Sequence, residues 1–355
     1  IGDEGKDWAY RLVGQSEWSA YFPDCRGTSQ SPIDVVTTQT KYDPSLIPLT
    51  PLGYSQHGNK PFTLYNNGHT AVIELPEWMG LGGLPWLFTA VQMHLHWGSG
   101  GPSHGGSEHT INGLSADAEL HVVHYNSELY PNMSAAMTQR DGLAVLGILI
   151  VETNLAFNSI LNYLSRIRHA DQKVPIPAFD IQSLLPKDLG RYYRYNGSLT
   201  TPPCYQSVIW TVFHERVQIS KAQLLKMETI LYSSKADNPD RMLLQDNYRA
   251  TQPLNHRVVF ASFSAGEVTA IVIGVMCGCV EIRRHCAVVI CSLFCFYSTR
   301  GCSRHWPPVC CCSGLTGQCA DTMGDVTVEK SSLFSSSISY LLADFLDSST
   351  VKQSW

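Results

Sequence analysis

The sequence predicts a β-dominated α+β domain with peripheral helices, followed by an atypical C-terminal tail. Three observations support this: short runs of β-forming residues recur between turn residues, only two segments have helical periodicity, and the cysteines are unevenly distributed. The chain has 355 residues, of which 44% are apolar, so it has enough apolar material for a folded core. The formal net charge of -5 argues against nucleic-acid binding, which needs a basic surface.

The expected strands are apolar or alternating runs rich in β-branched and aromatic residues. In chain order they are Phe62–Tyr65, Ala71–Leu75, Ala90–Trp97, Glu119–Tyr125, Ala144–Glu152, Ser207–Val212 and Arg257–Phe260. The segments between them contain typical turn residues at Asn66–Gly68, Gly80–Gly83 and Asn196–Gly197. Helical periodicity is convincing at Ser159–Ile167 and Ser220–Tyr232, where the Ser220 hydroxyl is suited to cap the helix.

The cysteines indicate a change of composition near Ser262–Glu267. Of 12 cysteines, only Cys25 and Cys204 precede residue 264. We therefore expect one globular domain at residues 1–263 and an apolar, cysteine-rich segment at residues 264–300, which is a candidate for a degenerate membrane anchor. Residues 301–355 are expected to form a disordered Cys- and Ser-rich tail.

Three histidines are placed to share one face of a sheet. In the expected strand Val91–Trp97, residues two apart share a face, so His94 and His96 project the same way, about 6 to 7 Å apart. If Glu119–Tyr125 pairs antiparallel with that strand, His121 supplies a third imidazole. Three imidazoles on one buried face indicate a metal ion, because unpaired buried polar groups are costly. On spacing alone, hydrogen-bonded core histidines are the alternative.

Two polar neighbours favour the metal. Gln92 shares the face of His94, and Glu119 shares the face of His121; such groups accept the second ring N–H of a ligating histidine. Three neutral imidazoles without a Cys ligand favour Zn2+, with a fourth position for a water that the ion acidifies. The sequence contains no H-E-x-x-H segment, which argues against a zinc protease.

Eight motifs carry a further signal. They are Gln30–Asp34, Asn66–His69, Gln92–Gly98, Gly106–Thr110, Ala118–His124, Gly142–Gly147, Gly197–Cys204 and Asn247–Arg249. In this order and spacing, the sequence resembles the α-class carbonic anhydrases over about residues 7–263. The resemblance implies a central, mostly antiparallel sheet of ten strands, with zinc at the base of a conical cleft.

The resemblance also implies a reaction: reversible hydration of carbon dioxide to bicarbonate and a proton by a zinc-bound hydroxide. His94, His96 and His121 would be the zinc ligands. Thr200 would accept a hydrogen bond from the hydroxide and donate its own proton to the carboxylate of Glu108, which can only accept. The implied substrate-binding positions are Thr200, Thr201, Val123, Val145, Leu199 and Trp210. From composition alone, the apolar ones are ordinary core residues and Thr200 is an ordinary turn residue.

His69 matches the proton shuttle of the family. An imidazole suits this role because its unperturbed pKa lies nearest neutrality, although a lone histidine after a turn would otherwise carry no functional meaning. Tyr10 and Asn67 match positions that hold a water chain beside it. The remaining histidines considered are expected to be structural or exposed: His57, His104, His124, His214 and His256.

Several features imply an exported protein, secreted or at the outer face of the plasma membrane. Cys25 and Cys204 correspond to the disulfide of the extracellular, membrane-associated members. Asn132 and Asn196 begin glycosylation sequons. The similarity is greatest to the single-span transmembrane members, notably type fourteen.

The tail departs from those relatives. The apolar runs Val268–Val280 and Cys286–Tyr297 are each too short to cross a bilayer core of about 30 Å at about 1.5 Å per residue. A single span over both would bury charged residues. A membrane contact through lipidated tail cysteines is one interpretation, and a tail from an aberrant exon or reading frame is the other, which the abrupt composition favours.

An enzyme is the main hypothesis, with carbon dioxide and bicarbonate as its small-molecule partners and with sulfonamide-type and anion inhibitors expected. The alternative is a catalytically silent carbonic-anhydrase-like ectodomain that serves in binding or adhesion. Silent members typically lose ligand histidines, whereas His94, His96 and His121 are all present. Esterase activity on larger substrates would use the same hydroxide and is not exclusive. The sequence does not predict an oligomeric state.

Overall fold

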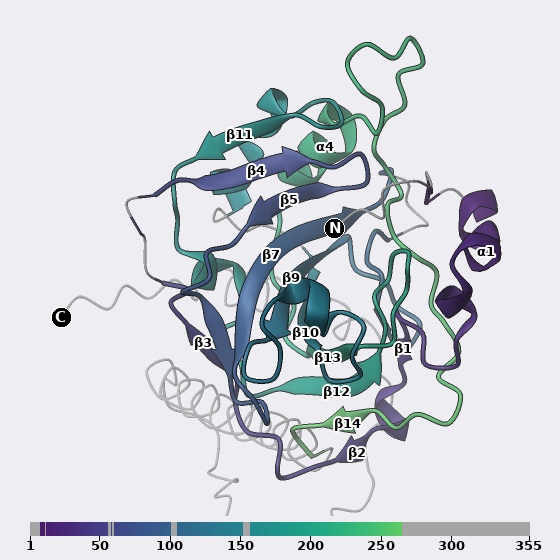
Figure 1. The fold of residues 1–355 in the computed structure, drawn as a ribbon, viewed down its shortest axis with the longest axis vertical. Coiled ribbons are helices and arrows are strands. Elements are labelled where there is room, and N and C mark those ends of the chain that lie inside the picture. Colours follow the sequence, from purple (N-terminus) through teal and green to yellow (C-terminus); the bar gives the residue numbers. More distant parts are fainter. Residues whose placement is uncertain are drawn as a thin grey trace, which may run out of the picture. The chain divides into compact units, whose positions relative to one another are not determined.

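A computed structural model describes residues 8–10, 12–55, 58, 60–100, 105–151 and 157–264 (Figure 1). The predicted tail segments, His57 and His104 lie outside the described residues. Within these ranges, none of the helices has both the length and the apolar character needed to cross a membrane.

The strands are β1 Asp34–Val35, β2 Lys41–Tyr42, β3 Thr50–Leu52, β4 Phe62–Asn66, β5 Ala71–Glu74, β6 Gly80–Gly82, β7 Phe88–Trp97, β8 Thr110–Ile111, β9 Ala118–Asn126, β10 Leu143–Ile150, β11 Lys173–Ile176, β12 Tyr192–Gly197, β13 Val208–Phe213 and β14 Phe260–Ala261. The α-helices are α1 Leu12–Tyr21, α2 Met133–Ala136, α3 Asn158–Leu161 and α4 Lys221–Ile230. Short 3-10 helices are η1 Pro23–Arg26, η2 Thr37–Gln39, η4 Leu164–Arg166 and η5 Ile181–Leu184.

One large sheet of 12 strands organises the domain. Its main path runs β11-β4-β5-β7-β9-β10-β13-β12-β14-β2, and the β3–β6 pair joins it through β7. Along this path only β10 with β13 and β14 with β2 pair in parallel. The ten strands of the path and their mostly antiparallel pairing confirm the expected fold class.

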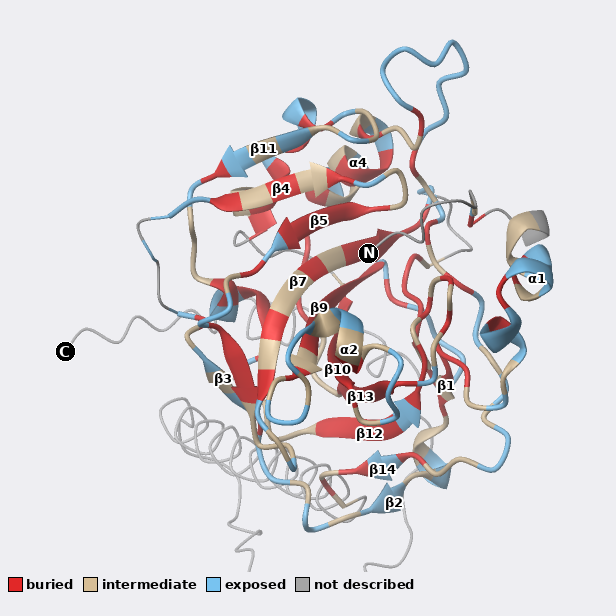
Figure 2. Ribbon diagram, in the orientation of Figure 1, coloured by how far each residue is buried: buried red, intermediate tan, exposed pale blue. Residues whose placement is uncertain are grey.

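The central strands β9, β10 and β13 are buried along almost their whole length. β7 beside them also has residues of intermediate exposure, which are tan in Figure 2. Along β9, Leu120 and Val122 belong to the larger apolar cluster of the core. Val123 lies in the opposite face and packs in a second cluster with Val145 and Trp210. The sheet therefore has a main core on one side and a smaller apolar layer, next to the histidines, on the other.

Most of the expected strands are confirmed. The differences from the prediction lie at the edges of the sheet and in the turns between strands. Arg257–Phe260 was expected as a strand, but only Phe260–Ala261 pairs, with β12 and β2. Gly80–Gly83 and Asn196–Gly197 were expected as turns, yet they contribute to β6 and to the end of β12. Tertiary pairing overrides the local turn preference of glycine and asparagine at these places.

Of the two predicted helices, one is confirmed and the other is not. Ser220 caps α4 in a capping box with Gln223, as expected. The predicted helix Ser159–Ile167 is instead broken into α3 and η4. Its apolar residues, among them Ile160 and Leu164, are buried in the core, so burial of the segment does not require one continuous helix.

Candidate metal centre and active-site cavity

The three predicted metal ligands converge from two neighbouring strands. β7 and β9 pair antiparallel, and His94 lies directly opposite His121. His96 follows two residues after His94, so both imidazoles project from one face of β7. The ring centroids are 5.0 Å apart for His94 and His96, 5.2 Å for His94 and His121, and 4.5 Å for His96 and His121. One ring nitrogen from each lies within 4.8 Å of the other two, close enough to share one ion.

The outward nitrogens of the two β7 histidines face oxygen acceptors. His94 Nδ1 lies 2.9 Å from Gln92 Oε1, and His96 Nδ1 lies 2.7 Å from the backbone oxygen of Asn247. Because amide and carbonyl oxygens only accept, each Nδ1 carries the ring proton. The Nε2 of both rings is therefore left with a free lone pair.

His121 has the opposite tautomer. Its Nε2 donates to Glu119 Oε1 at 2.8 Å, so its Nδ1 carries the lone pair. That Nδ1 lies 3.0 Å from His96 Nε2. Two lone pairs facing each other at this distance repel unless a cation lies between them, and three neutral imidazole nitrogens suit Zn2+. The donor set of this site fits zinc.

Burial keeps the three imidazoles neutral. It lowers the pKa of His94 well below the usual value, lowers that of His96 to about 4 and also lowers that of His121. Neutral rings are the form that binds a metal ion.

Glu119 is the centre of a buried hydrogen-bond network behind the ligands. Its Oε2 accepts the backbone N–H groups of Glu108 and His109 at 2.9 and 2.7 Å, and its Oε1 accepts His109 Nδ1 at 2.7 Å in addition to His121. Burial alone would raise the pKa of Glu119, but His109 and His121 outweigh it and hold this pKa well below the usual value. His109 Nε2 in turn faces Tyr195 Oη at 2.7 Å. Since these atoms are already paired, we interpret the group of His109, Glu119 and His121 as support for the ligands and not as a second metal site.

Glu108 has an oxygen left over next to the metal-facing nitrogens. Its side chain is fully buried, and its Oε1 accepts the backbone N–H of Arg249 at 2.9 Å. Oε2 lies 3.5 Å from His96 Nε2 and 3.8 Å from His121 Nδ1, and within the described residues it has no hydrogen-bond partner. Burial raises the pKa of Glu108 to about 7, while the hydroxyl of Thr200 is near enough to favour the ionised form.

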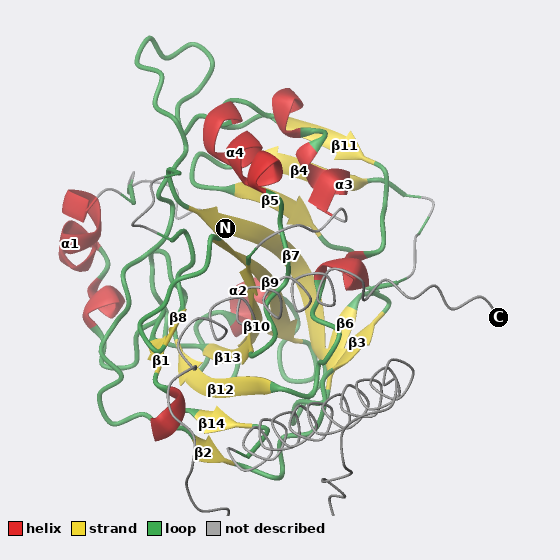
Figure 3. Cartoon of the chain, turned by 180° about the vertical axis from the view of Figure 1, so that it is seen from behind, coloured by secondary structure: helices red, strands yellow, loops and turns green. Residues whose placement is uncertain are grey.

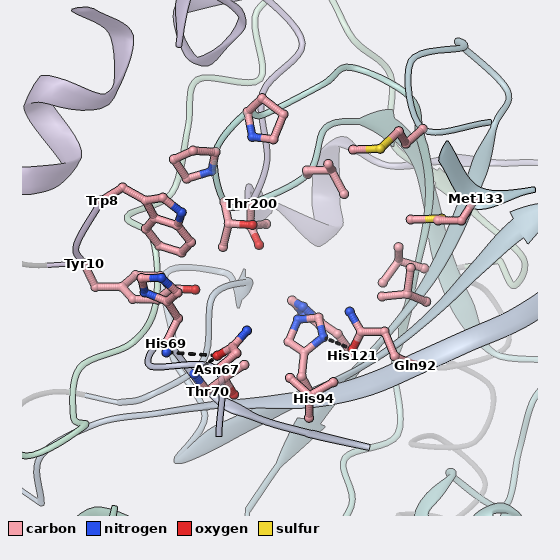
Figure 4. Close-up of a pocket in the computed structure, with 18 of the residues that line it drawn as sticks. Trp8, Tyr10, Asn67, His69, Thr70, Gln92, His94, His121, Met133 and Thr200 are labelled. Atoms are coloured by element: carbon pink, nitrogen blue, oxygen red, sulfur yellow. Dashed lines mark hydrogen bonds between the residues drawn. The ribbon is translucent and has the colours of Figure 1, made fainter. Parts of the chain in front are cut away.

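A cavity of about 610 Å³ opens beside the histidines (Figure 4). All the predicted substrate-binding residues line it, namely Thr200, Thr201, Val123, Val145, Leu199 and Trp210. The predicted residues Tyr10, Asn67, His69, Gln92, His94 and His121 line it as well. Trp8, Tyr65, Met133 and Met137, which the sequence analysis did not single out, complete much of its wall.

The segment that carries Thr200 is anchored at both ends. The backbone N–H of Cys204 donates to Thr201 O at 2.9 Å. Cys204 is joined to Cys25 by a disulfide with Cα atoms 4.9 Å apart, as the resemblance implied. At the other end, Ser198 Oγ accepts the backbone N–H of Ser31 at 2.9 Å. The backbone on either side of Thr200 is therefore tied to the N-terminal part of the chain.

His69 lies at the side of the cavity, in the turn between β4 and β5. Gly68 allows this turn with a φ of 84°, and Asn67 Oδ1 accepts the backbone N–H of His69 at 2.9 Å. The imidazole stacks on Trp8, with ring centroids 3.8 Å apart and an interplanar angle of 6°. Tyr10 is 6.4 Å away, ring centroid to ring centroid. Figure 4 shows these side chains grouped across the cavity from His94.

Two residues near the C-terminal end of the domain support the site in a way that the sequence did not predict. Asn247 accepts from His96 through its backbone oxygen, accepts Trp97 N at 2.8 Å through Oδ1 and donates to His69 O at 3.0 Å. Arg249 positions Glu108. The only signal for either was the motif Asn247–Arg249, because no local pattern reveals a partner some 150 residues away.

The histidines expected to be structural or exposed are consistent with that prediction where they are described. His124 is fully buried, with Nε2 2.6 Å from Tyr54 Oη and Nδ1 3.1 Å from Ala144 O, and burial lowers its pKa to about 4. His214 packs edge-on against Tyr193. His256 is exposed.

The two predicted glycosylation sites are both exposed. Asn132 caps α2 by accepting Ala135 N, and Asn196 lies near the end of β12. Glycosylation of either residue stays a prediction.

Known proteins resemble the chain over the same region. A sequence model of the family described as eukaryotic-type carbonic anhydrase matches residues 13–263. Human carbonic anhydrase 12 is 45% identical over 267 residues, which cover 74% of this chain and 75% of the relative. Carbonic anhydrase 6 of Bos taurus is 42% identical over 267 residues, covering 72% of this chain and 81% of the relative. Human carbonic anhydrase 3 is 37% identical over 266 residues, covering 73% and 99%.

Proposed function

Because the chain belongs to the eukaryotic-type carbonic anhydrase family, we propose that its cavity catalyses the reversible hydration of carbon dioxide to bicarbonate and a proton. The observation that carries the proposal is the convergence of three unprotonated ring nitrogens, from His94, His96 and His121. Zn2+ held by these nitrogens would act as a Lewis acid that lowers the pKa of a coordinated water and so supplies hydroxide near neutral pH.

Thr200 and Glu108 orient the nucleophile. The Thr200 hydroxyl is close enough to the Glu108 carboxylate to favour its ionised form, so this carboxylate can accept the hydroxyl proton of Thr200 while its Oε1 also accepts the Arg249 N–H. A hydroxyl has one proton to donate, so Thr200 Oγ1 can then only accept from the attacking hydroxide. This turns the proton of the nucleophile away from the substrate and its lone pair towards it.

Carbon dioxide binds against the apolar wall of the cavity. It has no net dipole and no hydrogen to donate, so apolar side chains hold it without competing for the nucleophile. Val123, Val145 and Trp210 are buried in one apolar cluster, and Leu199 packs against it. Thr201 is the polar neighbour available to the oxygens of bicarbonate.

His69 exports the proton. Its ring lies on the cavity wall and beside Trp8, so it can exchange protons with solvent without blocking the metal centre. Asn67 fixes the turn that carries it, and the buried Tyr10 borders the space between it and the ligands, where ordered waters would relay the proton.

A catalytically silent binding module is not favoured. Such a protein has no need for three neutral imidazoles whose tautomers are all fixed for metal binding. Hydrolysis of activated esters would use the same nucleophile and accompanies the proposal without replacing it. Sulfonamides, which inhibit the family in general, are expected to compete at the same cavity.

The domain works outside the cell, in the secreted form or at the outer face of the plasma membrane. The bond between Cys25 and Cys204 supports this, because disulfides persist in oxidising compartments. Residues 1–263 as the catalytic domain, a membrane contact through residues 264–300 and the special likeness to type fourteen remain predictions.

Stopped-flow measurement of carbon dioxide hydration by the full chain tests the proposal. Activity should disappear after zinc is removed with a chelator and return when zinc is added back. Hydration at the same rate in protein shown to be free of metal would contradict it.

A further inference from the structure

Arg249 carries a guanidinium that is buried without an ion-pair partner. The residue is 5% exposed, and none of the ion pairs found among the described residues includes it. Glu108 accepts a hydrogen bond from the backbone N–H of Arg249 and not from its guanidinium. A buried charge of this kind is costly unless hydrogen bonds or a counter-ion compensate it.

Hydrogen bonds compensate the guanidinium only in part. Nη1 donates to Gln30 Oε1 and to Ser31 O, both at 2.9 Å, and Nη2 donates to Cys25 O at 3.2 Å. One side of the group packs over the Trp18 ring, 5.5 Å from its centroid. An arginine has five N–H donors, and in the described part of the chain no hydrogen bond joins Nε or the second proton of Nη2 to a protein acceptor. Nε is not among the fully buried atoms left without a partner, so it is accessible to solvent.

Arg249 lies in the wall of a second cavity, of about 290 Å³. Arg26 provides a second guanidinium there, and Nη2 of Arg26 is 3.3 Å from Ser19 Oγ. The other lining residues include no Asp or Glu; they are Gln15, Ser19, Cys25, Gly27 and Gln252. The cavity lies between η1, the segment near Gln252 and α1, which Figure 1 shows at the periphery of the domain. It shares no lining residue with the catalytic cavity.

We propose that this cavity, between Arg26 and Arg249, is a second anion site that binds a planar oxyanion of the carboxylate type. A guanidinium presents parallel N–H groups that match two oxygens of a planar anion. Gln252 Nε2 keeps one proton beyond its bond to Ala250 O and can donate it to the third oxygen or to an ordered water. Bicarbonate and small carboxylates share this chemistry; the choice of bicarbonate as the natural occupant rests on the proposed function.

The test follows the Arg249 Nε–H resonance by NMR in the full, zinc-loaded chain saturated with a sulfonamide, so that anions cannot bind at the zinc. Sodium bicarbonate and sodium acetate are titrated separately, with sodium chloride at equal ionic strength as the control salt. Both oxyanions should shift the resonance with saturation, and chloride should not. The acetate result does not depend on the proposed reaction, so it separates failure of this site from failure of the enzyme assignment.

Variants away from the catalytic residues test the location. Arg26→Gln should weaken binding about tenfold or more, the effect of losing one charged contact. Gln252→Glu should abolish it by placing a carboxylate in the cavity. Arg140→Gln removes another exposed arginine, which lies outside this cavity, and should change nothing.

Equal shifts with chloride, a response that never saturates, or unchanged binding in both Arg26→Gln and Gln252→Glu would overturn the proposal. Bicarbonate binding without acetate binding would contradict the carboxylate-type chemistry. Acetate binding without bicarbonate binding would contradict bicarbonate as the natural occupant of this cavity.

Discussion

Each of the three imidazoles is fixed by one acceptor, and this determines what the centre can bind. A histidine whose outer nitrogen donates to an oxygen has its inner nitrogen unprotonated. The separation of 3.0 Å between His96 Nε2 and His121 Nδ1 is therefore favourable only with a cation nearby. At the residue scale, the chemistry of the site follows from the tautomers.

Thr200→Ala should separate orientation from metal binding. The Thr200 hydroxyl is not part of the group of metal-binding nitrogens, so zinc content should stay normal. Hydration should fall by roughly 10² or more, the scale of losing one preorganised polar contact in a transition state. Thr200→Ser, which keeps the hydroxyl, is the matched control and should retain most activity. Loss of zinc along with activity would show that Thr200 is structural.

His69→Ala should slow proton export alone. We expect a lower kcat with kcat/KM spared, because the proton leaves after the hydration step, and added imidazole buffer should restore much of kcat. His256→Ala, an exposed histidine away from the cavity, is the control and should leave both parameters unchanged. A His69→Ala enzyme indifferent to buffer concentration would mean that another group carries the proton.

Alternation along a strand made part of this site predictable. Gln92 and Glu119 are two residues from the histidines they orient, so period-2 geometry places each pair on one face. The acceptor for His96 is 151 residues away, and Arg249 is 141 residues from Glu108. Contacts of that range depend on the path of the chain, which periodicity does not reveal.

At the scale of elements, β9 separates two kinds of histidine. His121 faces the cavity with Val123, while His124 faces the main core, where Tyr54 Oη donates to its Nε2 and its Nδ1 donates to Ala144 O. The β-strand period puts these two histidines on opposite faces, so one serves metal binding and the other serves stability.

Tyr54→Phe tests this division. The variant leaves His124 Nε2 buried without a donor, and the free energy of unfolding should fall by about 1 to 3 kcal/mol, the usual cost of an unsatisfied buried group. Zinc content and hydration at moderate temperature should not change. Chemical denaturation and metal analysis measure the two effects; loss of zinc without loss of stability would contradict the assignment of faces.

Central strands were easier to predict than edges. β7, β9 and β10 are long, apolar and rich in β-formers, and their predicted ranges lie close to the observed ones. β12 and β6 contain Asn-Gly or glycine residues that read as turns, and their strand character comes from pairing with β13 and β7. The local sequence does not reveal the stabilisation that comes from pairing with a neighbouring strand.

At the scale of the whole domain, the disulfide joins residues separated by 179 positions. The chain-entropy model credits a loop of that size with at most about 5 kcal/mol. The bond also anchors the segment of Thr200 near Arg249, whose side chain donates to Cys25 O. Reduction, or Cys25→Ser, should therefore lower both the Tm and the hydration activity. Two thiols titrating in the native, non-reduced protein would contradict the bond and the extracellular location.

The most direct test of the central claim is the zinc content and the hydration rate of His94→Ala, measured side by side with the unaltered full chain. The account predicts one zinc ion in the unaltered protein, and loss of most zinc and nearly all hydration in the variant. Full hydration by metal-free His94→Ala protein would contradict it.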